Sequence, residues 1–291
     1  MNKIVVVGLS GESVFLNIDH FNKPGETVLA KSKFTEPGGK GYNQALALGM
    51  INADVSFITV LGSDPYKDEC LKVLKENNVK VYPVFKDVSS SYAVIETDNK
   101  GENNVCLYKG ASDLLTFEDI LVYLDVIKSA DILLIQLEFK KEVVENIIKL
   151  AHDNNVKVIL NPAPFVKLSN NVLSLVDIIT LNYFEASQLF NTSNVEEGMM
   201  ESTIPNIIVT NGSKELLIKT DGKLEKIKVK KVNAVDTTGA GDIFNSFFTY
   251  YCSFYNIYKS AKLASIASTI SVTRQGVVNA IPKLSEVSID D

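Results

Sequence analysis

Residues 236–242 form a short run, Asp-Thr-Thr-Gly-Ala-Gly-Asp, directly before a predicted helix. The small residues Gly239, Ala240 and Gly241 leave backbone N–H groups free at the positive end of that helix. An anion such as a transferring phosphoryl group can bind there. Asp242 stands in the first turn, where it can accept a proton from an incoming hydroxyl. The alternative is a tight turn whose aspartate only caps the helix, and this segment alone leaves both interpretations open.

A second glycine-rich segment, residues 37–43, reads Pro-Gly-Gly-Lys-Gly-Tyr-Asn and also precedes a predicted helix. Its three glycines allow the backbone to approach a ligand closely, while Lys40 and Asn43 offer hydrogen-bond donors for hydroxyl groups. The segment is not a Walker A loop, because Phe34 stands where the first glycine belongs and Lys40 is followed by glycine.

Other catalytic chemistries have little support in the sequence. The Gly239-Ala-Gly241 run is not a dinucleotide-binding loop, since Phe244 stands in place of the third glycine, and an NAD-dependent enzyme is disfavoured. The cysteines and histidines are Cys70, Cys106, Cys252, His20 and His152. Their spacing contains no C-x-x-C pair and no histidine cluster, which disfavours a zinc, redox or Ser-His-Asp site. We expect the cysteines to be buried apolar groups.

The composition is that of a globular protein, with 46% hydrophobic and 22% charged residues in 291. The net charge of −6 argues against a broad surface for nucleic acid or anionic lipid. The apolar run 4–8 is too short for a signal sequence or a membrane span. We therefore expect a cytoplasmic protein that binds small molecules and neither nucleic acid nor membrane.

The elements that must position these residues follow an alternating pattern of strands and helices. Strands are predicted at 4–8, 55–60, 131–135, 156–160, 177–181 and 206–210, with a further hairpin at 214–231 that turns at Asp221-Gly222. Helices are predicted at about 40–51, 66–77, 116–129, 139–154, 183–191, 240–257 and 259–273. Such alternation predicts an α/β fold around a mostly parallel sheet.

Two stretches, residues 11–36 and 80–110, interrupt the alternation with strands that no helix covers. Because they lie far apart in the sequence and each has an apolar face, we expect a small β lid that closes a cleft or pairs with another subunit. The apolar strands at 92–95 and 104–108 make a homodimer through this lid a hypothesis.

Together, the two glycine-rich segments resemble the two signatures of the ribokinase family of carbohydrate kinases. Between them, four segments resemble parts of that family in the expected order: Gln136-Leu-Glu138, Asn161-Pro-Ala-Pro164, Asn182-x-x-Glu185 and Thr210-Asn-Gly-Ser-Lys214. The resemblance covers essentially the whole chain, residues 1–291. It implies a single domain with a three-layer α/β/α fold, a mostly parallel central sheet and a β-sheet lid. It also implies ATP-dependent phosphorylation of a hydroxyl on a sugar or sugar-like molecule.

The resemblance assigns a role to each matching residue. Asp242 would be the catalytic base, and the N–H groups of residues 239–241 would form the anion hole. Asn182 and Glu185 would organise Mg²⁺ and water around the phosphates, although helix capping is the alternative. The substrate would contact Gly11, Ser13, Gly39, Lys40, Asn43, Glu138 and Asp242.

The nucleotide and cation positions follow from the same resemblance. The nucleotide would contact Asn182, Thr210, Gly212, Gly239, Gly241, Ala264 and Ala267. The segment 261–276 would line its pocket, with Ala264, Ile266 and Ala267 against the adenine ring. An activating monovalent cation, K⁺, would be held by Asp236 and Thr238 together with backbone carbonyls near Ser271, Arg274 and Gly276.

The sequence departs from the family pattern at the end of the first strand. The family has Gly-x-x-Asn-x-Asp there, whereas this chain has Gly11 and Ser13 in place of the Asn and the Asp. The neighbouring Glu12 is expected to point to the opposite face of its strand. Losing a charged hydrogen-bond partner costs about 1.5–3 kcal/mol of binding free energy. That loss is enough to weaken the binding of ribose or to indicate another substrate. Tyr42 either adds bulk beside the substrate or packs on the lid.

Two alternatives to a sugar kinase follow from these departures. One is a kinase of the same family for a nucleoside or a modified sugar. The other is a non-catalytic regulatory protein that binds nucleotide or sugar, and the intact Asp242 and Gly-Ala-Gly run argue against it.

Overall fold

The computed structural model describes residues 1–288. The strands of its large sheet are β1 (Lys3–Val7), β4 (Asp54–Leu61), β5 (Lys80–Phe85), β8 (Ile132–Gln136), β9 (Lys157–Asn161), β10 (Ile178–Asn182), β11 (Asn206–Thr210), β12 (Leu216–Thr220) and β13 (Lys223–Ile227). Their order is β13-β12-β11-β10-β9-β8-β1-β4-β5. All pairs from β5 to β11 are parallel, whereas β12 and β13 add an antiparallel hairpin at one edge.

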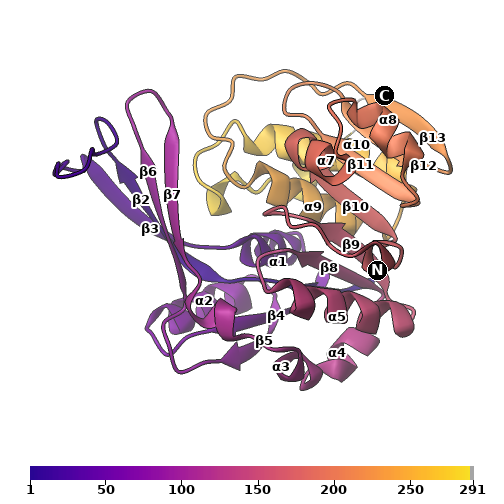
Figure 1. Ribbon diagram of the computed structural model, residues 1–291, viewed down its shortest axis with the longest axis horizontal. Helices are drawn as coiled ribbons and strands as arrows, with labels where there is room; N and C mark the ends of the chain where they lie inside the picture. The colour runs from indigo at the N-terminus through magenta and orange to yellow at the C-terminus, as the bar shows by residue number, and fades with distance from the viewer. Residues whose placement is uncertain (289–291) are drawn as a thin grey trace.

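Helices cover both faces of this sheet (Figure 1). One face carries α1 (Lys40–Met50), α2 (Tyr66–Glu76), α9 (Ala240–Tyr251) and α10 (Ile257–Ser271). The other carries α3 (Phe117–Leu121), α4 (Leu124–Lys128), α5 (Lys141–Asp153), α6 (Asn170–Leu173), α7 (Tyr183–Phe190) and α8 (Val195–Glu201). Successive strand residues alternate between the two cores: Ile4 and Val6 face the first, Val5 and Val7 the second. The predicted three-layer α/β/α fold is confirmed.

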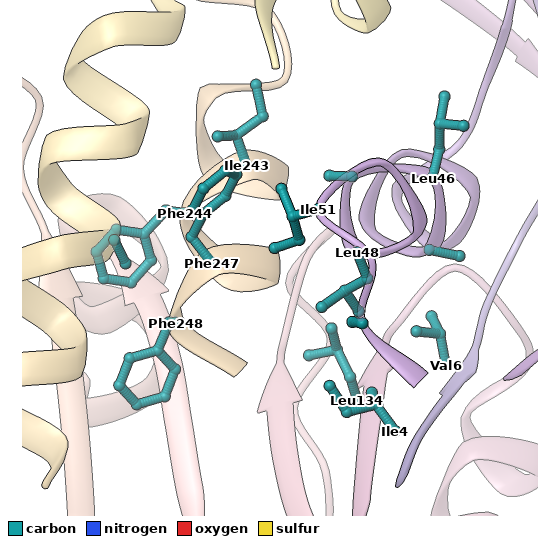
Figure 2. Close-up of a cluster of buried hydrophobic side chains, with 14 of the residues drawn as sticks. Ile4, Val6, Leu46, Leu48, Ile51, Leu134, Ile243, Phe244, Phe247 and Phe248 are labelled. Atoms are coloured by element: carbon teal, nitrogen blue, oxygen red, sulfur yellow. The ribbon is translucent and has the colours of Figure 1, made fainter. Parts of the chain in front are cut away.

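Helices α1 and α9 lie side by side on the sheet although about 200 residues separate them in the chain. Figure 2 shows Leu48 of α1 and Phe247 of α9 in one apolar cluster with Ile4 and Leu134 of the strands below. Phe247 is fully buried, and burial of such a side chain contributes about 1.5–3 kcal/mol to stability. This packing of α1 against α9 fixes the position of the glycine-rich segment 37–43 relative to the segment 236–242.

A second sheet projects from one side of the body in Figure 1. It contains β2 (Gly11–Asn17), β3 (Ser32–Gly38), β6 (Ser91–Thr97) and β7 (Asn103–Tyr108) in the order β3-β2-β6-β7. The inner pair β2 and β6 is parallel, and the two outer pairs are antiparallel. We call this sheet the lid. The predicted lid segment 80–110 begins too early, because residues 80–85 form β5, which pairs with β4 at the edge of the large sheet.

Two predicted helices differ from the observed ones. The segment 116–129 contains two short helices separated at Tyr123, whose φ of −107° and ψ of 24° interrupt the helical backbone. The segment 240–257 ends at Tyr251, and Asn256 begins the next helix by accepting a hydrogen bond from the Lys259 N–H at 2.9 Å. Helices α6 and α8 were not predicted. Within residues 1–288, none of the helices is long and apolar enough to cross a bilayer.

Candidate active site

Asp242 lies in the first turn of α9, at the edge of the sheet where the parallel strands end, and its side chain is only 6% exposed. Both carboxylate oxygens accept hydrogen bonds from α1. Asn43 Nδ2 donates to Oδ2 at 2.9 Å, and Gln44 Nε2 donates to Oδ1 at 2.9 Å. Two amides from one helix therefore fix the orientation of this carboxylate, and each of its oxygens retains a further lone pair for a ligand.

Gln44 connects Asp242 to the ends of the neighbouring strands. Its Oε1 accepts a hydrogen bond from Gln136 Nε2 at 2.5 Å, and its Nε2 also donates to Asn161 Oδ1 at 3.2 Å. Asn161 in turn donates to the carbonyl of Thr180 at 3.1 Å. The carboxyl ends of β8, β9 and β10 thus hold Gln44 in place, which is where ligands usually bind in parallel sheets.

A second branch of this network fixes the start of α9. Thr180 Oγ1 donates to Asn245 Oδ1 at 2.5 Å, and Asn245 Nδ2 donates to the carbonyl of Gly241 at 2.9 Å. We call the polar network of Asn43, Gln44, Gln136, Asn161, Thr180, Asp242 and Asn245 the catalytic junction. Sequence analysis did not assign roles to Gln44, Thr180 and Asn245. The available signal was the presence of buried amides and a hydroxyl within otherwise apolar segments.

Glycines bring the first turn of α1 against the end of β1. A Cβ on Gly8 would lie 2.6 Å from the Cα of Gly41, so neither position has room for a side chain. Gly39 has a φ of 96°, which glycine adopts without strain. The resulting approach lets Glu138 accept hydrogen bonds through Oε2 from the backbone N–H groups of Lys40 at 2.9 Å and Gly41 at 3.3 Å.

Four ionisable side chains, Lys40, Glu138, Glu185 and Asp242, share this part of the cleft. Burial is the main cause that raises the pKa of Glu138 to about 8, with Lys40 opposing the shift and Asp242 adding to it. The charge of Asp242 raises the pKa of Lys40, burial opposes this, and Glu138 and Glu185 reinforce it. The amine of Lys40 is therefore held in its charged form among three carboxylates.

A cavity of about 310 Å³ opens above Asp242 and is also lined by Lys40, Asn182, Glu185 and Gly239. Asn182 and Glu185 form a reciprocal cap at the start of α7. Glu185 N–H donates to Asn182 Oδ1 at 2.8 Å, and Asn182 N–H donates to Glu185 Oε2 at 2.9 Å. The two residues thus cap a helix and line the cavity at once.

The residues around this cavity fit Mg²⁺ when phosphates supply part of its coordination. In residues 1–288 we find no group of three or more His, Cys, Asp or Glu side chains that could hold a metal alone. Mg²⁺ commonly takes one or two carboxylates and completes its shell with water and substrate phosphates. Burial raises the pKa of Glu185, whereas the Asn182 N–H and the charge of Lys40 act to lower it. This is expected for a carboxylate without a full set of partners.

A second cavity, of about 390 Å³, shares Thr210, Thr237, Gly241 and Phe244 with the first. Gly212, predicted to contact the nucleotide, also lines it.

The segment 261–276 contributes to the second cavity, but through other residues than the alanines expected to contact the adenine. Ala264 and Ala267 are fully buried in the hydrophobic core and do not line the second cavity. Ser265, Ser268 and Thr269 of the same helix line it instead. The rotation of α10 about its axis therefore presents hydroxyl groups to the cavity, one position along the chain from the predicted alanines.

The residues predicted to hold a monovalent cation lie on two adjacent loops. Asp236 accepts hydrogen bonds from the N–H of Thr238 at 2.9 Å and from the N–H of Gly276 at 3.0 Å. Burial acts to raise the pKa of Asp236, but these N–H groups hold it below its usual range. The Ser271 carbonyl accepts from the N–H of Arg274 at 2.9 Å, and the Arg274 side chain pairs with Glu286. Carboxylate and carbonyl oxygens suit a hard cation such as K⁺, whereas the observed partners of the Asp236 carboxylate are the two N–H donors.

The lid residues lie apart from the cavity above Asp242. Gly11 is buried against the backbone of Ser91, and Ser13 Oγ lies against Gly38, so neither lines that cavity. Glu12 lines a separate pocket with Tyr92, as expected for the opposite face.

Tyr42 does not contact the cleft. Its side chain is fully buried in the core on the α1 face of the sheet and lines none of the cavities described above, so it adds no bulk to them.

Comparisons with known proteins now add to this geometry. Residues 1–284 match the family described as pfkB family carbohydrate kinase. The ribokinase of Staphylococcus aureus (strain COL) is 32% identical over 300 residues, which cover 99% of each chain. A crystal structure of a ribokinase from Thermotoga maritima is 32% identical, with a TM-score of 0.91 over 99% of this chain and 98% of that chain.

The fold is also that of an Arabidopsis thaliana ribokinase whose structure was determined in complex with ribose and ATP. That protein is 24% identical, with a TM-score of 0.87 over 98% of this chain and 97% of that chain. The family match over nearly the whole chain and the 32% identity to a relative of equal length agree with each other. The chain therefore belongs to the pfkB family of carbohydrate kinases and is a sugar phosphotransferase.

Proposed function

We propose that this protein transfers the γ-phosphoryl group of ATP to a hydroxyl of a sugar, with Asp242 as the catalytic base. The observation that carries the proposal is the placement of the Asp242 carboxylate, which two amides of α1 orient at the start of α9 in the wall of the first cavity, next to Gly241, which lines both cavities. A base must lie within hydrogen-bond reach of the proton it accepts, and this carboxylate borders the space where a hydroxyl and a phosphate can meet.

In the proposed reaction the hydroxyl oxygen attacks the γ-phosphorus, its proton passes to Asp242, and ADP leaves. The N–H groups of Gly239, Ala240 and Gly241 stabilise the negative charge on the moving phosphoryl group. Gly239 has a φ of 72° and begins α9, so this loop combines a left-handed turn with the positive end of a helix. Closure of the lid would exclude water that otherwise hydrolyses ATP.

We assign the nucleotide to the second cavity, beside Thr210 and Gly212, with its phosphates directed toward α9. The hydroxyl groups of α10 that line this cavity can hydrogen-bond the nucleotide. Mg²⁺, held through Glu185 and water, would supply charge neutralisation for the phosphates. K⁺ would bind beside Asp236 and stabilise the loop that leads into residues 239–241. We place the reaction in the cytoplasm, where ATP is regenerated.

The sugar would contact Lys40, Asn43 and Glu138, with Gly11 and Ser13 of the lid on its other side. A second candidate is a nucleoside or a sugar with an aromatic substituent. The rings of Phe15 and Phe34 stack with centroids 4.4 Å apart, and both line a cavity of about 640 Å³ beneath the lid. An aromatic ring is the kind of group that such a surface accommodates.

The substrate is tested by measuring ADP release from Mg-ATP across pentoses, hexoses, deoxysugars and nucleosides, with and without K⁺. We expect strong turnover on one sugar class and a higher rate with K⁺ than with Na⁺ at equal ionic strength. Reactions without acceptor give the background hydrolysis. Turnover on nucleosides alone would favour the second candidate, and absence of acceptor-dependent ADP release would contradict the proposed function.

We also propose that two copies associate through their lids. Val105 and Leu107 lie on the same face of β7 and are 59% and 52% exposed, which is unusual for adjacent apolar positions. We expect Val105→Lys to convert a dimer into a monomer in sedimentation experiments, because a charge buried in an apolar interface has no partner. Lys223→Glu, on the exposed edge strand β13, is the control and should leave the mass unchanged. A wild-type monomer at high concentration would contradict this proposal.

A further inference from the structure

The lid has Ser13 where the family pattern has an aspartate, so the carboxylate of that position is missing. The structure places a different carboxylate, that of Glu36, beside Ser13. In the register of the lid, Ser13 on β2 is directly opposite Glu36 on β3. Side chains of directly opposed residues in an antiparallel pair point to the same face, with Cβ atoms about 4.5–5.5 Å apart. Glu36 therefore lies on the face of the lid that Ser13 occupies, whereas Glu12 lies on the other face.

The surroundings of Glu36 leave its carboxylate short of partners. It lines the cavity beneath the lid together with Asp236 and Gly276. Its side chain is half-buried, and the lining of this cavity contains no Lys or Arg side chain. Among the ion pairs of residues 1–288, none involves Glu36. A half-buried carboxylate beside a second carboxylate is stabilised by hydrogen-bond donors, which the hydroxyls of a sugar can supply.

The position of Glu36 also brings it near the loop that precedes α9. Its Oε2 lies 3.7 Å from the place where a Cβ on Gly276 would be. The next residue, Val277, packs against Gly239, since a Cβ on that glycine would lie 2.7 Å from Val277 Cγ1. Glu36 thus faces the cleft across from the residues that border the phosphoryl group in the proposed reaction.

We propose that Glu36 is the specificity-determining lid residue of this enzyme and binds a hydroxyl of the sugar in place of the carboxylate missing at Ser13. This inference rests on the proposed sugar kinase function. Because Glu36 is one methylene longer than aspartate and comes from the neighbouring strand, the recognised hydroxyl lies toward β3. The sugar selected by this enzyme therefore has a hydroxyl that points to that side of the lid when its reactive hydroxyl faces Asp242.

The test compares Glu36→Gln with the matched control Glu12→Gln, which removes the same charge from the other face of the same sheet. For the sugar found in the substrate survey, we expect Glu36→Gln to raise the KM for sugar about 10- to 100-fold, the effect of losing one charged hydrogen bond. The KM for ATP should change less than about twofold. Glu12→Gln should keep the wild-type KM for both substrates.

A second variant separates binding from lid stability. Ser13→Asp combined with Glu36→Gln returns a carboxylate to the same face of the lid, and we expect it to recover most of the lost sugar affinity. Calorimetric titration of sugar in the presence of a non-hydrolysable ATP analogue measures this directly. A wild-type sugar KM in Glu36→Gln, equal losses in Glu36→Gln and Glu12→Gln, or no recovery in the double variant would each overturn the inference. Absence of sugar turnover by the wild-type enzyme would instead contradict the proposed function itself.

Discussion

The catalytic junction and the inner face of the lid differ in how completely their polar groups are paired. In the junction, Asp242 and Gln44 are buried, and hydrogen bonds between α1 and α9 and from the ends of β8 and β9 fix both side chains. On the lid, Glu36 faces an open cavity whose lining contains no Lys or Arg side chain, and Phe34 is 47% exposed beside it. Asp242 and Gln44 of the junction are thus already paired, while the polar groups on the inner face of the lid still need partners.

The largest effect should come from the centre of the junction. We expect Asp242→Asn to lower kcat about 10²- to 10⁴-fold, because the variant keeps the shape of the side chain and loses the proton acceptor. ATP and sugar affinities, measured by calorimetry, should remain close to the wild-type values. Asp153→Asn, an exposed position at the end of α5, is the control. If Asp242→Asn retained wild-type kcat, the assignment of the base would be wrong and the junction would serve structure alone.

A smaller effect is expected when the support of Asp242 is removed. Gln44→Leu keeps the volume of the side chain but leaves the carboxylate and the amides of Gln136 and Asn161 without one partner each. We expect kcat to fall up to about 10²-fold through loss of orientation, with little change in the KM for ATP. Urea denaturation should show a loss of about 1–3 kcal/mol in unfolding free energy. Gln188→Leu, on the exposed side of α7, should change neither quantity. Normal turnover in Gln44→Leu would show that Asn43 alone orients the base.

The smallest effect on turnover, though not on stability, concerns Glu138, which accepts hydrogen bonds from the first turn of α1. Its pKa is about 8 in the folded chain against an ordinary value of 4.5, so the folded chain binds the extra proton between these pH values. The unfolding free energy should therefore fall as the pH rises through this window. Glu138→Gln cannot ionise and should lose this pH dependence.

The measurement is urea denaturation of both proteins, without ligands, from pH 5 to pH 9. Glu76→Gln, exposed at the end of α2, is the control and should follow the wild-type curve. Parallel curves for wild type and Glu138→Gln would show that Glu138 is ionised throughout, which would make its environment more polar than the geometry indicates.

The sequence predicted the parts of this molecule whose requirements are local. Gly39 and Gly239 were singled out because small residues before a predicted helix let the backbone meet a ligand, and both have a positive φ in the structure. The Asp221-Gly222 turn of the β12–β13 hairpin was predicted from its turn sequence. Asp242 and Asn43 were found within or beside such glycine-rich segments. The role of Gln44 was missed, since it depends on where the distant strands β8 and β9 end.

Three other differences have physical reasons as well. The face of α10 that lines the second cavity was not the expected one, because alanines and serines alternate along this helix. Small residues define a buried face only weakly. Strand β5 was assigned to the lid because it contains Pro83 and has an alternating pattern. Both features suit any exposed edge strand, including that of the large sheet. Helices α6 and α8 contain four and seven residues, too few for a clear periodic pattern. Such features are decided by tertiary packing.

The close contact between β2 and β6 limits what position 11 can hold. A Cβ at Gly11 would lie 2.7 Å from the carbonyl oxygen of Ser91 and 2.9 Å from its Cβ. An asparagine at position 11 therefore requires the two strands to separate. Positions 11 and 91 are sterically coupled, so a substitution at one constrains what the other can hold. A library that varies both positions together should reach substrates that libraries of either position alone do not.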